Sequence, residues 1–310
     1  MQIIEINLED HFKFEIPITA CIGYFDGLHV GHQALIKQTD ILAQKYQCAQ
    51  AMISFDPDPW MVTKELNDVK HINSQRDKLH LLKAMQIDYL IILKFTKEMA
   101  ALSSEDFVKL LVERLNLKAL VTGFDFHYGA YGSGNIDSLA LQAEGYFETS
   151  VVDAIRDEYG KISSSRIEEE LLNGNIGYAS KMLGYDYFVQ GIVVKGRQKG
   201  REIGFPTANV AYDDHILLPK KGVYAGYVKI AAQCFKAIIN LGHNPTFNFQ
   251  EKDSLEVHIL DFNQMIYGQH IKVIFVQYIR DEKKFNSVEA LTKQIDSDCL
   301  HARQLETITK

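Results

Sequence analysis

The sequence predicts an α/β chain in two parts, a parallel sheet covered by helices as far as residue 184 and a smaller β-rich part from 185 to 310. In the first part, short apolar strands alternate with amphipathic helices, which is typical of a parallel sheet covered on both faces. In the second part, β-rich runs separated by Gly, Pro, Asn and Asp indicate a small barrel or sandwich. A chain of 310 residues has room for two domains of ordinary size.

Elements of the first part follow one another as strand, helix, strand. The predicted strands cover 19–25, 49–55, 88–95, 118–124 and 147–154, and the predicted helices cover 31–46, 74–86 and 104–115. In parallel sheets, ligands bind beyond the carboxyl ends of the strands. Three polar stretches fall at such ends: "GYFDGLHVGH" (23–32), "FDPDPW" (55–60) and "GFDFHYGAYGSG" (123–134).

The second part loses its helices until the last twenty or so residues. Its β-rich runs cover 187–196, 222–231, 234–242, 255–262 and 270–279, and a helix is predicted over 287–305. Several runs alternate with a period of two, as in Leu255, Val257 and Ile259 against Glu256 and His258. We therefore place the domain boundary near Gly184, with domains 1–184 and 185–310.

Composition excludes several broad functions. A formal net charge of −7 disfavours a generic nucleic-acid or anionic-membrane binder, although it allows a local phosphate site. The first residues lack a signal-peptide layout, and no apolar run is long enough to span a bilayer. The four cysteines are widely spaced and form no CxxC pair, so neither a zinc site nor a disulfide framework is indicated. We predict a cytoplasmic protein with reduced thiols.

His29 and His32 lie three residues apart, where a strand is expected to give way to a helix starting at Gly31. They could be packed or solvated loop residues. They could also bind a metal, but a third ligand would then be needed nearby, and the sequence names none. A third interpretation is a phosphate site, because a helix start offers unpaired N–H groups and a positive dipole end. Imidazoles there can stabilise charge developing on phosphorus.

The motifs together resemble a known family. "GYFDGLHVGH", "FDPDP", "GFDFHYG" and "KISSSRI" look like the adenylyltransferase half of the bacterial bifunctional riboflavin kinase/FAD synthetases, whose HxGH motif is shared with other nucleotidyltransferases. "GREIGFPTAN", "GVYAGYV", "NLGHNPTF", "LEVHILDF" and "YIRDEKKF" resemble the flavokinase barrel of the same family, in the same order. The resemblance covers nearly the whole chain. It implies a Rossmann-like nucleotidyltransferase domain followed by a six-stranded β-barrel ending in a helix.

For the first domain, the resemblance implies an adenylylation site. His29 and His32 would stabilise the pentavalent phosphorus and the leaving pyrophosphate, and Asp125 would contact the flavin. The residues expected to bind the nucleotide are Gly23, Phe25, Asp26, Gly31, Ser163, Ser164 and Ser165.

For the barrel, the resemblance implies a kinase without a Walker A motif, which occurs nowhere in the chain. Glu256 would be the general base for the riboflavin hydroxyl. Thr207 and Asn209 would supply oxygens to Mg²⁺ and the nucleotide, which suits a hard cation. The loop that contains Gly196 and Gly204 would cover the phosphates. Asn240 and Arg280 would lie near the flavin.

One position departs from the family pattern. The serine-rich motif usually continues as an Ile-Arg pair whose arginine helps to hold phosphates, but here Glu168 stands in that place. Ser165 and Glu168 have the S-x-x-E spacing of a helix capping box, which gives Glu168 a local structural explanation. A carboxylate at a helix start would nevertheless repel a phosphate. Arg166 or Lys161 could substitute for the missing arginine.

The expected function is a two-step flavin enzyme that uses Mg²⁺ with ATP, acts on riboflavin and FMN, and forms FAD. Two alternatives remain open from the residues. One is a riboflavin kinase whose first domain has weakened or lost adenylylation, which Glu168 favours. The other is a flavin-binding sensor without turnover, which Thr207, Asn209 and Glu256 disfavour.

Overall fold

The protein is described by a computed structural model that covers residues 1–67, 69–196, 199–244 and 252–306. The chain divides into two compact units, residues 1–71 with 75–163 and residues 72–74 with 164–310. The part of "NLGHNPTF" from residue 245 onward lies outside the described residues.

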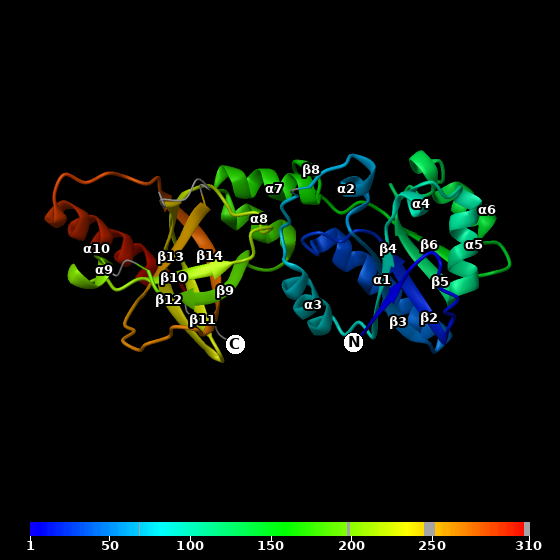
Figure 1. Cartoon of the computed structure of the whole chain (residues 1–310), viewed down its shortest axis with the longest axis horizontal. Coiled ribbons are helices and arrows are strands. Elements are labelled where there is room, and N and C mark those ends of the chain that lie inside the picture. The colour runs from blue at the N-terminus through cyan, green and yellow to red at the C-terminus, as the bar shows by residue number, and fades with distance from the viewer. Residues whose placement is uncertain (68, 197–198, 245–251, 307–310) are drawn as a thin grey trace. The chain divides into compact units, whose positions relative to one another are not determined.

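A six-stranded parallel sheet forms the centre of the first unit (Figure 1). The strand order is β1-β4-β3-β2-β5-β6. Strand β3 pairs with one edge of β2, and after β4 the chain crosses back so that β5 pairs with the other edge of β2. The order therefore reverses beside β2, which is where ligands bind in open sheets of this kind. The strands are β1 (Gln2–Ile6), β2 (Phe14–Ile22), β3 (Ala49–Asp56), β4 (Tyr89–Lys94), β5 (Leu115–Gly123) and β6 (Glu148–Val152).

Helices cover both faces of this sheet, because alternate side chains of each strand point to opposite faces. Ile18 and Ile22 of β2 enter a core with Phe107 of α5, whereas Cys21 enters a separate core with Leu35 of α1. The helices of the unit are α1 (Val30–Tyr46), α2 (Pro59–Thr63), α3 (Gln75–Ala84), α4 (Lys97–Ala100), α5 (Ser104–Arg114) and α6 (Ile136–Gln142). A 3-10 turn (Ala130–Gly132) and a small hairpin of β7 (Arg156–Asp157) and β8 (Gly160–Lys161) complete it.

The second unit contains a closed antiparallel barrel with the order β10-β13-β12-β11-β14-β9 (Figure 1). Inside it, Tyr224 and Phe275 are fully buried and meet edge to face, with ring centroids 5.2 Å apart. Outside it, the last helix packs on β11 and β12. The strands are β9 (Phe188–Val194), β10 (Ala208–Tyr212), β11 (Gly222–Ile230), β12 (Gln233–Asn244), β13 (Lys252–Ile259) and β14 (His270–Arg280), and the helices are α7 (Ser164–Asn173), α8 (Ile176–Leu183), α9 (Lys199–Glu202) and α10 (Val288–Gln304).

The predicted fold class is confirmed, with local differences. Residues 23–25 were expected to end a strand, but β2 stops at Ile22 and the chain turns there. Strands β1 and β10 were not predicted, because each has only five residues and carries weak alternation. β10 is the strand that closes the barrel, since it pairs with both β9 and β13.

Helices α7 and α8 belong to the same compact unit as the barrel. The sequence boundary near Gly184 places them with the first domain instead. That boundary stays a prediction about where the functional domains meet.

Candidate active sites

His29 is the N-cap of α1, where it closes the start of the helix. Its Nδ1 accepts the backbone amides of Gly31 (3.1 Å) and His32 (3.4 Å). A neutral imidazole that accepts at Nδ1 carries its proton on Nε2, so His29 can donate from that nitrogen. The helix begins at Val30, one residue before the predicted start. The remaining N–H groups and the dipole of α1 favour an anion at this point.

His32 lies against His29, with the two rings stacked and their centroids 3.7 Å apart. Phe25 meets His32 edge to face at 5.1 Å. Burial is the main cause that lowers the pKa of His29 to about 4, and it holds the pKa of His32 well below its usual value. The Nδ1 atom of His32 is buried and has no hydrogen-bond partner among the described residues. Both rings are therefore neutral at physiological pH, and one nitrogen remains unpaired.

The glycine inside this motif has a structural reason. A Cβ on Gly31 would lie 2.9 Å from Cε1 of the His29 ring and 3.1 Å from its Nδ1. Gly31 was expected to bind the nucleotide, but the imidazole of His29 fills the space beside its Cα. Phe25 (φ 61°) and Leu28 (φ 42°) adopt left-handed backbone conformations that non-glycine residues rarely take. The loop before α1 is therefore strained, and such strain is often found at functional sites.

Two lysines bring positive charge to the histidine pair. Lys161 forms an ion pair with Asp125 and lies 4.9 Å from the centre of the Phe124 ring. Lys78 of α3 donates to the Tyr24 carbonyl (2.7 Å). Both ammonium groups help to lower the pKa of His32, after burial and His29. The sequence pointed to Lys161 but not to Lys78, because Lys78 occupies one position among the charged residues of an ordinary amphipathic helix.

Carboxylates interact with both of these lysines. Asp26 is buried. The charges of Asp26, Asp56 and Asp58 raise the pKa of Lys78 and so oppose the effect of its desolvation. Asp26 was expected to contact the nucleotide, and the structure places it close to the Lys78 ammonium. The predicted flavin residue Asp125 is engaged by Lys161.

The serine motif marks the division between the two units. Ser163 ends the first unit, and Ser164 and Ser165 begin α7. The predicted capping box is wrong, because the helix starts at Ser164 and Ser165 is already inside it. Glu168 consequently lies in the second helical turn. Arg166 donates to the Tyr178 hydroxyl and stacks over that ring at 5.6 Å.

An aromatic pocket of about 770 Å³ lies in the first unit, beyond the carboxyl ends of β3, β4 and β5. Phe55 is the next-to-last residue of β3, Phe95 follows β4, and Phe126 follows β5. Phe107, Tyr128 and Met99 add to the lining. The sequence pointed to this edge of the sheet, but it did not identify the pocket, because its walls come from separate segments.

In the barrel, three of the predicted residues lie side by side. Strand register pairs Asn209 of β10 with Glu256 of β13, and Glu256 in turn with Asn240 of β12. Leu255 and Val257 are buried, so Glu256 points to the outer face of the barrel. Residues directly opposite in antiparallel strands have Cβ atoms about 4.5–5.5 Å apart. The row therefore gathers one carboxylate between two amides.

A glycine-rich segment packs against one end of this row. A Cβ on Gly196 would lie only 2.1 Å from Nδ2 of Asn209. A Cβ on Gly200 would lie 2.3 Å from the Phe205 carbonyl and 3.4 Å from the Thr207 hydroxyl. Gly204 has a φ of 87°, the left-handed region that favours glycine. The segment approaches Thr207 and Asn209 closely because side chains are absent there.

Arg280 is held by the last helix. Its Nε lies 3.1 Å from both carboxylate oxygens of Asp298, and its Nη2 donates to the same group at 2.7 Å. Asp298 is 1% exposed and also accepts from Gln294 (2.9 Å). The guanidinium therefore ties β14 to α10. A contact of Arg280 with a flavin stays a prediction.

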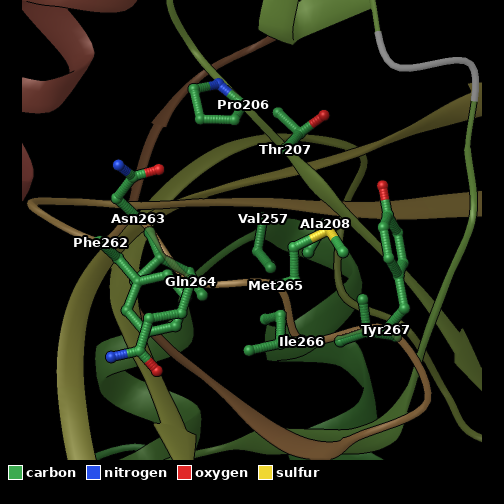
Figure 2. Close-up of a pocket in the computed structure, with 12 residues that line it drawn as sticks. Pro206, Thr207, Ala208, Val257, Phe262, Asn263, Gln264, Met265, Ile266 and Tyr267 are labelled. Atoms are coloured by element: carbon green, nitrogen blue, oxygen red, sulfur yellow. The ribbon is translucent and has the colours of Figure 1, made fainter.

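A pocket of about 200 Å³ opens beside the "PTAN" segment of the barrel. Figure 2 shows Pro206 and Thr207 along one side, Phe262 and Tyr267 on the flanks, and Ile266 opposite. Val257 also reaches it from β13. The pocket therefore combines apolar side chains with the hydroxyls of Thr207 and Tyr267 and the amides of Asn263 and Gln264. Thr207 is already predicted to face a nucleotide.

The fold and these two sites define a two-domain transferase, with a nucleotidyltransferase-like sheet and a flavokinase-like barrel. Residues 13–166 match the family model described as FAD synthetase, and residues 183–306 match the model described as riboflavin kinase. Curated relatives named bifunctional riboflavin kinase/FMN adenylyltransferase include one from Listeria monocytogenes, 37% identical over 92% of this chain and 91% of its own length. Another, from Escherichia coli, is 34% identical over 97% of both chains. The chain belongs to the bifunctional riboflavin kinase/FMN adenylyltransferase family, as the motifs predicted.

A solved structure supports the fold of the whole chain. The crystal structure of a protein from Streptococcus pneumoniae, named a macrolide-efflux protein, has a TM-score of 0.89 and 33% identity, covering 98% of this chain and all of the other. Among the helices that the structure describes here, none has the length and apolar character needed to cross a membrane.

Proposed function

We propose that the chain makes FAD from riboflavin in two ATP-dependent transfers, one in each family domain. In the barrel, the riboflavin 5′-hydroxyl attacks the γ-phosphorus of ATP, and ADP leaves. In the first domain, an FMN phosphate oxygen attacks the α-phosphorus of a second ATP, and pyrophosphate leaves. Membership of the bifunctional family supports both steps. The row of Asn209, Glu256 and Asn240 is the observation that carries the kinase step.

For the kinase step, Glu256 takes the proton of the attacking hydroxyl, because it is the one carboxylate in that row. The pocket beside Thr207 takes the flat adenine ring, which directs the phosphates toward Thr207 and Asn209. The close approach of Gly196 to Asn209 lets backbone N–H groups cover those phosphates.

Domains of these families use ATP, generally with a divalent metal. The donors available in the barrel fit Mg²⁺, since a hydroxyl, an amide oxygen and a nearby carboxylate are all hard oxygen ligands. When bound, the ion would neutralise charge on the phosphates. Thr207 and Asn209 are the residues that we assign to hold it.

For the adenylyl step, the start of α1 and the Nε2 proton of His29 bind the reacting phosphate. The neutral, buried state of both histidines suits donation to an anion without a prior change of protonation. Lys161 adds positive charge at the same place. The aromatic pocket accommodates the isoalloxazine ring of FMN, because its volume and its phenylalanine walls match a flat apolar tricycle.

One incubation tests the proposal. The protein is mixed with riboflavin, ATP and Mg²⁺, and FMN and FAD are resolved chromatographically. We expect FMN first and FAD after it. FMN alone would indicate a kinase whose first domain has lost adenylylation, the alternative that Glu168 favours. Formation of neither product would leave a flavin-binding protein without turnover. A cytoplasmic location remains a prediction from the sequence.

A further inference from the structure

Lys78 is a partly buried cation that the proposed chemistry leaves without a role. Its Nζ donates to the Tyr24 carbonyl (2.7 Å) and to the Ser54 hydroxyl (3.2 Å). The Ser54 hydroxyl donates to the same Tyr24 carbonyl (3.2 Å). The ammonium also lies 5.2 Å from the centre of the Tyr24 ring, within the range of a cation–π contact. Lys78 thus links α3 and β3 to the residue that starts the loop before α1.

That loop is the strained part of the first site. Tyr24 directly precedes Phe25, and both Phe25 (φ 61°) and Leu28 (φ 42°) are left-handed although neither is a glycine. Such conformations persist only where the surroundings fix them. Gln33 fixes the far end, because its Nε2 donates to the Leu28 carbonyl (2.9 Å). Lys78 fixes the near end.

The loop in turn positions the side chains of the two histidines. Phe25 contacts the His32 ring, and Leu28 immediately precedes the N-cap His29. A shift at Tyr24 therefore passes to both imidazoles.

Charge gives a second reason for a cation at this position. Asp26, Asp56 and Asp58 all face Lys78, and an anionic substrate beside them would be repelled without compensation. Burial lowers the pKa of Lys78 to about 8, and the three carboxylates oppose that change.

We propose that Lys78 is a positioning residue for adenylyl transfer: by holding the Tyr24 carbonyl, it keeps the loop of residues 23–29 in the conformation that aims His29 and His32 at the reacting phosphate. The inference rests on the proposed function of the first unit.

Three variants test it, with FAD formation from FMN and ATP as the measurement. Lys78→Met removes the donor and the charge, and we expect kcat to fall about 10²-fold with little change in the KM for FMN, as small misplacements of reacting groups do. Lys78→Arg keeps the charge but moves the donor, so a loss of about 10-fold is expected. Lys83→Met is the matched control, because Lys83 lies exposed on the same helix. Riboflavin phosphorylation by the barrel should not change in any of them.

A readout independent of turnover is the ¹⁵N NMR of the imidazoles. In the wild type, His29 should show the Nε2–H form, since its Nδ1 accepts two amides. His32 faces His29, Lys78 and Lys161, which all act to lower its pKa. In Lys78→Met, we expect the His29 tautomer signature to weaken and the apparent pKa of His32 to rise.

The outcomes separate the two proposals. If the wild type forms no FAD, the adenylyl function fails, and the NMR shifts decide the role of Lys78 by themselves. If Lys78→Met forms FAD at the wild-type rate with unchanged imidazole signals, Lys78 has no positioning role. If Lys78→Met does not fold, Lys78→Arg decides: a 10-fold loss with unaltered stability supports the role, and wild-type kinetics and signals overturn it.

Discussion

The two units hold their candidate sites by different means. In the first unit, the histidines are placed by a left-handed loop and a helix cap, and a cation from another helix holds the loop. In the barrel, Asn209, Glu256 and Asn240 are placed by strand register. A site built on a loop depends on the backbone, whereas one built on paired strands depends on its side chains. Small changes in the loop should therefore damage the first site, whereas in the barrel the row itself should be sensitive mainly where a glycine packs against it, as Gly196 does against Asn209.

The largest expected effect concerns where the barrel unit begins. A fragment of residues 164–310 should fold and phosphorylate riboflavin, whereas residues 185–310 should be unstable. The shorter fragment lacks α7 and α8, whose buried side chains are Ile167, Leu171, Ile176, Ala179, Met182 and Leu183. Their burial contributes roughly 15 kcal/mol as an upper bound, before the entropy cost of ordering the two helices. Thermal unfolding and FMN formation of both fragments are the measurements. Equal stability would place the boundary of the folding unit at residue 184.

Next in size is the side chain of Glu256. Glu256→Gln should reduce FMN formation about 10²- to 10⁴-fold, because a positioned general base is worth that much. Riboflavin binding, followed by flavin fluorescence, should remain. Conversion of added FMN to FAD in the same sample is the internal control. Near-normal kinase turnover would remove Glu256 from the role of base.

A backbone change provides the contrasting test. Gly31→Ala should reduce FAD formation about 10²-fold, since the new methyl group would displace the His29 ring, and misplaced catalytic groups lose about that much. Gly177→Ala in α8 is the matched control, because a Cβ added there would meet nothing within 4 Å. The control should leave both activities unchanged and add up to about 1 kcal/mol of helix stability. Equal FAD formation in the two variants would contradict the dependence on the backbone.

The smallest expected effect is on acid stability. The pKa of His29 is about 4 in the folded protein and about 6.5 when unfolded, so the unfolded chain binds more protons between these values. His29 should therefore contribute a loss of about 3 kcal/mol to the stability of the first unit as the pH falls from 6.5 toward 4. His32, whose pKa is also lowered, adds a loss of the same sign. Trp60, the single tryptophan, lies in this unit and reports its unfolding by fluorescence. His29→Gln should flatten the pH dependence, and an unchanged slope would show that the histidine is not its source.

The sequence by itself determined the two-part organisation and supplied most of the candidate site residues. Periodicity set the sheet and the barrel, and the motifs gave His29, His32, Asn209 and Glu256 at once, because each stands in a short local pattern. The family assignment also required nothing beyond the order of those motifs.

Only the tertiary structure decided which residues support them. Lys78 reaches the loop before α1 from a helix more than fifty residues away, so no local pattern marks it. Asp298 holds Arg280 in the same way, and the aromatic pocket is assembled from the ends of three strands. The row of Asn209, Glu256 and Asn240 exists only through strand register, which sequence spacing does not fix. The physical reason is common to all of them: burial, charge compensation and pairing act between segments that are distant along the chain.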